Sequence, residues 1–130
     1  PPDLSPSATS RNNDSVVLRF VYGSVAILLA GDIEQQAEAA LVESSADLRA
    51  DVLKVAHHGS KTSSTESFID RVQPGCAVIS VGERSRFGHP HAVVTGRYLS
   101  RGVTLFQTGR DGTVSIETDG VSVAANTFRE

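Results

Sequence analysis

Residues 51–64 read Asp-Val-Leu-Lys-Val-Ala-His-His-Gly-Ser-Lys-Thr-Ser-Ser, an apolar run that stops at two histidines, a glycine and several hydroxyl groups. The apolar residues are typical of a buried β-strand, and Gly59 ends it because glycine accepts backbone angles that other residues resist. Adjacent side chains on an extended strand point to opposite faces, so we expect unequal roles for His57 and His58. The alternative is a surface turn that merely contains two histidines.

The composition is that of one globular domain. The chain has 130 residues, of which 39% are hydrophobic and 21% charged, and this length is sufficient to bury a core. A net charge of −3 argues against a domain that binds nucleic acid through a bulk positive charge. No apolar run approaches the roughly 20 residues of a membrane helix, so we expect a soluble domain. The single cysteine, Cys76, excludes an internal disulfide and is expected to be a buried structural thiol.

The N-terminal part of the chain predicts a linker followed by a hairpin. Residues 1–14 are rich in proline and small polar residues and are interpreted as a loop or linker. The missing initiator methionine indicates a piece excised from a longer protein. Two β-rich runs follow, 15–22 and 24–30, and the tight turn between them predicts an antiparallel hairpin. The second run is apolar on both faces, as in a central strand.

Helical patterns then alternate with strands. Apolar spacing from Ile33 predicts a helix, and a second helix is expected before a strand over 76–81. A third helix, with Pro90 in its first turn, is expected to end before Gly102. Residues 103–125 alternate short strands and turns and are interpreted as a β-meander. The predicted fold class is α/β (α+β): a mixed sheet with helices packed on it and a C-terminal β-meander.

Asp32 lies between the second strand and the first helix, and two interpretations remain open. It can cap the helix, with Gln35 completing a capping box. A carboxylate at a strand end, preceded by Gly31, is equally suited to holding a metal. The two roles can coexist.

The four histidines form two clusters, His57/His58 and His89/His91, and each cluster follows a predicted strand, as Asp32 does. The carboxyl ends of neighbouring strands in an α/β layer form the crevice where ligands bind. We therefore expect these five residues at one site. Aspartate and imidazole ligands suit zinc or manganese.

Polar and basic residues flank the histidines: Ser60, Lys61, Thr62, Arg84 and Arg86. The first three precede a helix with Ser63 as the expected cap, and the free N–H groups of a helix N-terminus favour an anion such as phosphate. The two arginines would extend a positive rim around the metal. For each residue the alternative is a solvated, well-capped loop.

Four motifs, in order, carry a resemblance to a known family; they occupy residues 12–18, 28–32, 51–60 and 88–91. They are similar to the C-terminal half of the metallo-β-lactamase-like domain of ComEC-family DNA-internalisation competence proteins. The similarity covers about residues 12–118. It implies that residues 15–130 form part of a metallo-β-lactamase-like fold.

The resemblance also implies roles for individual residues. Asp32 would bridge the metals of a two-metal zinc or manganese site, His58 would be a metal ligand, and His57 would be a catalytic group that contacts the substrate. Related phosphodiesterase-like families use a metal-bound hydroxide to attack phosphorus. The remaining residues would surround the substrate: Ser60, Lys61, Thr62, Arg84, Arg86, His89 and His91.

One departure from the superfamily is the absence of its principal signature, His-x-His-x-Asp-His. The resemblance then implies that the other ligands belong to an upstream part of the parent and that this chain alone is inactive. The implied parent is a bacterial cytoplasmic-membrane protein with this nuclease or phosphodiesterase as an extramembrane domain. The implied partners are DNA and the rest of the parent channel, with self-association through an exposed sheet edge. The alternatives are another hydrolase of the superfamily, acting on a small phosphoester, thioester or lactam, and a non-catalytic domain that binds nucleic acid or protein.

Overall fold

A computed structural model of the chain describes residues 15–82 and 89–128. Its main sheet has the strand order β1-β2-β3-β4-β5. The strands are β1 (Leu18–Tyr22), β2 (Val25–Leu29), β3 (Val52–Lys54), β4 (Cys76–Ile79) and β5 (Thr104–Gln107). β1 pairs antiparallel with β2, and the other three pairs are parallel. The expected N-terminal hairpin and the expected α/β class are confirmed, and β2 lies inside the sheet.

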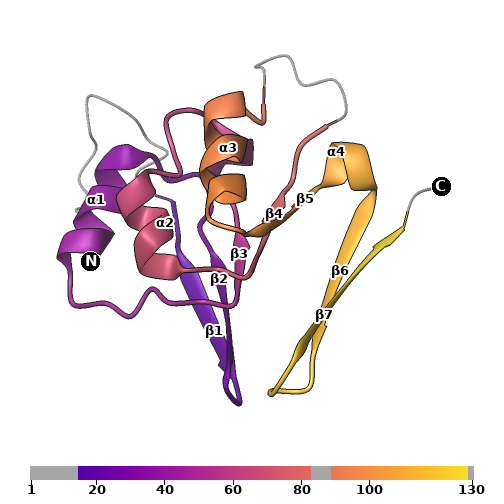
Figure 1. Cartoon of the computed structure of the whole chain (residues 1–130). Helices are drawn as coiled ribbons and strands as arrows, with labels where there is room; N and C mark the ends of the chain where they lie inside the picture. Colours follow the sequence, from indigo (N-terminus) through magenta and orange to yellow (C-terminus); the bar gives the residue numbers. More distant parts are fainter. Residues whose placement is uncertain (1–14, 83–88, 129–130) are drawn as a thin grey trace.

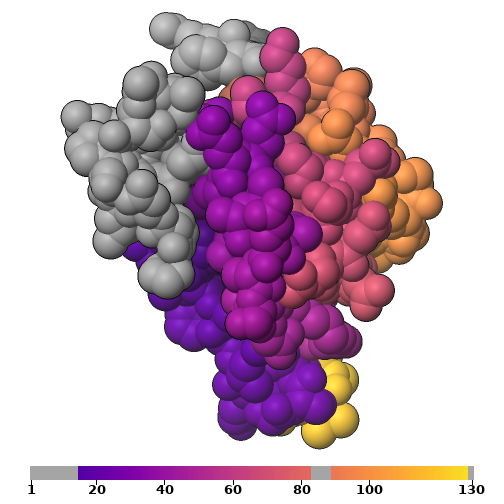
Figure 2. Space-filling view, turned by 90° about the vertical axis from the view of Figure 1, so that its left-hand side faces the viewer, coloured from indigo at the N-terminus to yellow at the C-terminus, as the bar shows by residue number. Residues whose placement is uncertain are grey.

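Three helices connect the parallel strands: α1 (Gln35–Glu43), α2 (Glu66–Val72) and α3 (Ala92–Ser100). All three cover the same face of the sheet (Figure 1). Figure 2 shows that face from outside, with the purple, pink and orange segments in front and the indigo β1–β2 end of the sheet visible below them. Helices on one face are the usual result when consecutive parallel strands are neighbours and every crossover has the same hand. Within 15–82 and 89–128, no helix is long and apolar enough to cross a membrane.

The core lies between the sheet and these helices. A row of side chains runs across the sheet, because Leu28 pairs with Leu53, Leu53 with Ala77, and Ala77 with Leu105. All four are buried, and the helices add further buried side chains: Ala37, Phe68, Ile69, Val72, Val94 and Tyr98. Burying one large apolar side chain contributes about 1.5–3 kcal/mol, so this layer holds the loops at the sheet's edges in place.

The C-terminal part differs from the expected meander. The strand expected over 103–106 is β5, which pairs in parallel with β4 and so belongs to the main sheet. Only β6 (Thr113–Thr118) and β7 (Val123–Phe128) form a separate antiparallel hairpin, after the short helical turn α4 (Thr108–Asp111). Alternation in a sequence predicts that a segment is a strand but not which strand it pairs with. Here the parallel ladder to β4 places β5 in the main sheet.

The hairpin is attached to the main sheet at both ends. At one end the Thr108 hydroxyl accepts from the Val81 N–H at 2.9 Å and donates to the Val81 carbonyl at 3.0 Å. At the other end the Ser24 N–H donates to the Gly120 carbonyl at 2.7 Å. A Cβ atom at Gly23 would lie 2.3 Å from that carbonyl oxygen, so only glycine allows the two turns to touch.

Cys76 is free and half-buried, whereas a fully buried thiol was expected. It lines a cavity of about 480 Å³ between the main sheet and the hairpin. Because Cys76 is partly buried, the pKa of its thiol is raised. The thiol is therefore protonated and unreactive at neutral pH.

Strand β1 is an edge of the main sheet in the described part of the chain, and it exposes apolar side chains. Leu18 is 47% exposed, Phe20 53%, Val21 60% and Tyr22 62%. Exposed, apolar edge strands are templates for pairing with another chain. The expected exposed edge is therefore present.

Candidate functional site at the carboxyl edge of the sheet

The two adjacent histidines lie in a tight turn at Ala56–Gly59, just after β3. His57 has φ 51° and ψ 44°, and His58 has φ 54° and ψ 25°, so both are left-handed. The expectation of an extended chain at the pair was therefore wrong. A left-handed conformation costs a non-glycine residue roughly 1–2 kcal/mol, and such strain is concentrated at functional sites.

Backbone hydrogen bonds from two other loops stabilise this turn. The His57 N–H donates to the Gly31 carbonyl after β2 at 3.0 Å, and the Gly59 carbonyl accepts from the His91 N–H at 2.9 Å. Gly59 itself has φ 79°, and a Cβ atom there would lie 2.7 Å from Pro90 Cβ. The carboxyl ends of β2, β3 and β4 therefore meet, as the sequence predicted.

His58 makes one short contact, between its Nδ1 and the Ser80 carbonyl at 2.6 Å. A carbonyl can only accept, so Nδ1 must carry the proton and Nε2 of the neutral ring keeps its lone pair. A carbonyl that orients an imidazole in this way is the usual support of a histidine that binds a metal through Nε2. His58 as a whole residue is exposed to solvent.

His57 faces different partners. Its Nδ1 lies 3.6 Å from Glu34 Oε2 and 3.4 Å from Thr62 Oγ1. Glu34 is a residue that the sequence interpretation missed. The two histidines therefore have unequal surroundings, as expected, although the reason is the turn and not strand alternation.

His89 and His91 lie on the other side of the turn. The rings of His57 and His89 are 5.8 Å apart, edge to face. Burial lowers the pKa of His89, and the neighbouring His57, His58 and His91 lower that pKa further. His91 is the N-cap of α3, because its Nδ1 accepts from the Val93 N–H at 3.2 Å. The expected helix that ends before Gly102 is thus confirmed, with Pro90 one residue before its cap and not in its first turn.

Asp32 is exposed in the turn after β2, next to Gly31, whose carbonyl contacts the histidine turn. It does not cap α1: the N-cap residue is Glu34, without a side-chain cap hydrogen bond. The capping-box prediction for Asp32 was wrong, because the helix begins two residues later than the apolar pattern indicated. The structure puts Asp32 at the same edge as the histidines.

The polar segment after the histidines is partly used within the protein. The hydroxyls of Ser60 and Thr62 lie 2.9 Å apart, while Lys61 is exposed. The expected cap of α2, Ser63, donates its hydroxyl to the Ile33 carbonyl instead, at 2.5 Å, and the cap position is Thr65. Two of the amides that lead into α2, those of Ser64 and Thr65, are already occupied.

Glu38 occupies those amides. Its Oε2 accepts from the Ser64 N–H and its Oε1 from the Thr65 N–H, both at 2.7 Å. The two arginines of the expected basic rim, Arg84 and Arg86, lie outside the described residues. The donor set at this edge is that of zinc or manganese sites. In the two described ranges, however, no group of three histidine, cysteine or acidic side chains could hold a metal.

Comparisons with known proteins place the chain in a family. No protein-family model matches it. It is similar to ComE operon protein 3 of Bacillus subtilis, 38% identical over 85% of this chain, and to Competence protein ComA of Neisseria gonorrhoeae, 35% identical over 91%. Recombination protein 2 of Haemophilus influenzae is 37% identical over 66%. The chain spans 14%, 17% and 11% of these relatives. The chain therefore belongs to the ComEC family of competence proteins, as its four motifs predicted.

Proposed function

We propose that the chain is part of a metal-dependent phosphodiesterase or nuclease domain, of the metallo-β-lactamase type, that acts on DNA during its uptake. The observation that carries the proposal is the 2.6 Å contact of His58 Nδ1 with the Ser80 carbonyl, which leaves Nε2 to bind a metal. Asp32 lies at the same edge of the sheet. The names of the relatives, which include a competence protein and a recombination protein, support DNA as the substrate.

His58 Nε2 and the Asp32 carboxylate would hold zinc or manganese. When bound, the metal would polarise the phosphodiester and supply an activated water. The other ligands would come from the rest of the parent, since the described residues contain too few. A metal site shared with the rest of the parent would have suitable ligands at this edge of the sheet but not a full set of them.

His57 would act beside the metal and not on it. The carboxylate of Glu34, 3.6 Å from Nδ1, favours a proton on that nitrogen. Nε2 of His57 would then accept a proton or a hydrogen bond from the substrate. His89, whose lowered pKa keeps it neutral, would line the substrate side with His91, Ser60, Lys61 and Thr62.

The test uses the complete domain of the parent, loaded with zinc or manganese. We expect it to cleave bis-p-nitrophenyl phosphate and DNA, to lose both activities with a chelator, and to leave a thioester and a cephalosporin intact. Preference for either of the last two substrates would contradict the phosphodiesterase assignment. DNA binding without hydrolysis of any substrate would identify a non-catalytic binding domain.

The DNA arm of the proposal has its own measurement. Arg84→Gln and Arg86→Gln should each lower the salt dependence of DNA binding by about 0.9 in the slope of log K against log salt, one lost phosphate contact for each. The exposed Arg49, whose guanidinium lies 3.1 Å from Asp51, provides the control as Arg49→Gln. An unchanged slope in both arginine variants would remove that loop from the DNA interface.

A further inference from the structure

Glu38 is a carboxylate in an unexpected place, fully buried on α1. Each of its oxygens accepts one backbone N–H, from Ser64 and from Thr65, at 2.7 Å. Amide donors on both oxygens favour the ionised form, in which both oxygens are acceptors only. The buried carboxylate of α1 thus binds the backbone of the segment that precedes α2.

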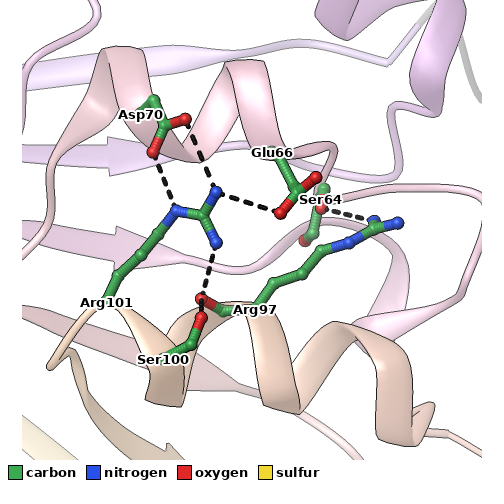
Figure 3. A network of polar contacts seen from close by, with 6 residues as sticks. All are labelled: Ser64, Glu66, Asp70, Arg97, Ser100 and Arg101. Atoms are coloured by element: carbon green, nitrogen blue, oxygen red, sulfur yellow. Dashed lines mark hydrogen bonds and ion pairs between the residues drawn. The ribbon is translucent and has the colours of Figure 1, made fainter.

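The same segment is held from a third element, α3. The hydroxyls of Ser64 and Tyr98 lie 2.9 Å apart, and Arg97 Nη1 donates to the Ser64 carbonyl at 2.9 Å. Ser64 has φ 59°, which a serine rarely adopts. Figure 3 shows Arg97 reaching over to Ser64, beside Arg101, which contacts Glu66 and Asp70 on α2. Helices α1 and α3 therefore fix one residue in a strained conformation.

The other end of the segment reaches the histidines. The Thr62 carbonyl accepts from the Gln35 N–H of α1 at 2.8 Å. The Thr62 hydroxyl lies 2.9 Å from Ser60 Oγ and 3.4 Å from His57 Nδ1. The Ser60 N–H donates to the His57 carbonyl at 2.9 Å. A displacement at Ser64 would therefore move the groups that touch His57.

Stability alone does not explain the buried carboxylate. Burial raises the pKa of Glu38 in spite of its two amide donors and the nearby Arg97, so its charge is held at a cost to folding. The N–H groups at a helix start can be satisfied more cheaply, by water or by a local serine or threonine side chain. The cap residue Thr65 makes no such side-chain bond. A costly partner from a distant helix is typical of positions that serve a site.

We propose that Glu38 is a positioning residue of the histidine site, holding residues 60–65 so that Thr62 stays against His57. Its importance for hydrolysis rests on the proposed function, whereas its effect on the segment does not. Tyr98 supports the same arrangement from the other side through Ser64. Glu38 touches neither substrate nor metal in this account.

The test compares Glu38→Gln with Ile69→Val, a truncation of a buried side chain of α2 that leaves the segment's hydrogen bonds in place. Nuclear magnetic resonance on the whole chain measures hydrogen exchange at the Ser64 and Thr65 amides and the contact between Thr62 and the His57 ring. In Glu38→Gln we expect the rate of hydrogen exchange to rise about tenfold or more at both amides. We also expect the Thr62–His57 contact to weaken. Ile69→Val should change exchange only as far as it changes global stability.

Unchanged exchange and an unchanged contact in Glu38→Gln would overturn the proposal. If that variant does not fold, Tyr98→Phe is measured in the same way, because it removes only the hydroxyl partner of Ser64. Unchanged exchange and an unchanged Thr62–His57 contact in Tyr98→Phe would then overturn the proposal. In the complete domain, Glu38→Gln should lower kcat with KM retained. A parent that hydrolyses no phosphodiester would overturn the proposed function and leave the chain measurements to decide the role of Glu38.

Discussion

The carboxyl edge of the main sheet and its β1 edge are stabilised in opposite ways. At the carboxyl edge, polar contacts tie three loops together, among them His57 N–H to Gly31 O and His58 Nδ1 to Ser80 O. At the β1 edge, apolar side chains such as Phe20 and Val21 face solvent. Hydrogen bonds can fix a loop within a short chain, whereas an apolar edge is stabilised only by a covering surface. The first region is therefore preorganised, whereas the second leaves apolar side chains exposed in the part of the chain that the structure describes.

The largest expected effect is at the carboxyl edge, in the complete domain. Asp32→Ala or His58→Ala should lower metal-dependent hydrolysis by at least about a hundredfold, because each removes a proposed metal ligand. His57→Ala should slow hydrolysis but retain the metal. Rates and metal content of the three variants decide the point. Loss of metal in His57→Ala, with metal retained in His58→Ala, would exchange the two roles.

A matched pair of phenylalanines compares the interior with the β1 edge. Phe68 is 1% exposed and Phe20 is 53% exposed. Phe68→Ala should lower the free energy of unfolding by about 3–5 kcal/mol, through lost burial and the cavity left behind. Phe20→Ala should lower it by less than about 1 kcal/mol. Urea unfolding measures both, and equal losses would show that β1 is covered in solution.

Self-association is the next effect in size. If β1 edges of two copies pair, Phe20→Lys should weaken association about tenfold, or 1.4 kcal/mol, because lysine on an edge strand opposes pairing. Leu99→Lys is the control, since Leu99 is an exposed apolar residue on α3. Sedimentation of the two variants measures the difference. An equal decrease in both would point to general hydrophobicity and not to the β1 edge.

The smallest effect is a pH dependence that comes from Glu38. Its pKa lies above the ordinary value of 4.5, so the folded state holds this proton more tightly than the unfolded state. The free energy of unfolding should then fall as pH rises from 4.5 through the raised pKa. The charged or titratable groups facing it are Arg97 and Tyr98 of α3. Urea unfolding at a series of pH values measures this decline, which Glu38→Gln should remove. A decline that persists in the variant would show that it does not come from Glu38.

The sequence predicted where the polar residues gather better than it predicted their contacts. Strand ends and the His57-His58 motif were readable, because parallel strands bring their carboxyl ends to one edge. The left-handed turn was not readable, since it depends on loops from β2 and β4. Glu38 did leave a signal: it lies three residues before Leu41, on the apolar side of the helix. Its partners, the Ser64 and Thr65 amides, come from another part of the chain and follow only from helix packing.

The C-terminal strands show the same limit. Alternation predicted strands near β5, β6 and β7, but it did not show that β5 pairs with β4 while β6 and β7 pair with each other. Asp32 looked like a helix cap because the capping-box spacing to Gln35 fits, yet α1 begins at Gln35. Local patterns predict elements well, while partners that are distant in sequence are set by tertiary packing.

The central claim is that this carboxyl edge supplies part, and only part, of a metal site. The most direct measurement is zinc and manganese content after dialysis, for the 130-residue chain and for the complete domain of the parent. A zinc site needs three or four protein ligands, so we expect stoichiometric metal in the complete domain and almost none in the chain, which should also fail to cleave DNA. Stoichiometric metal and DNA cleavage by the chain alone, or a complete domain without metal, would contradict the account.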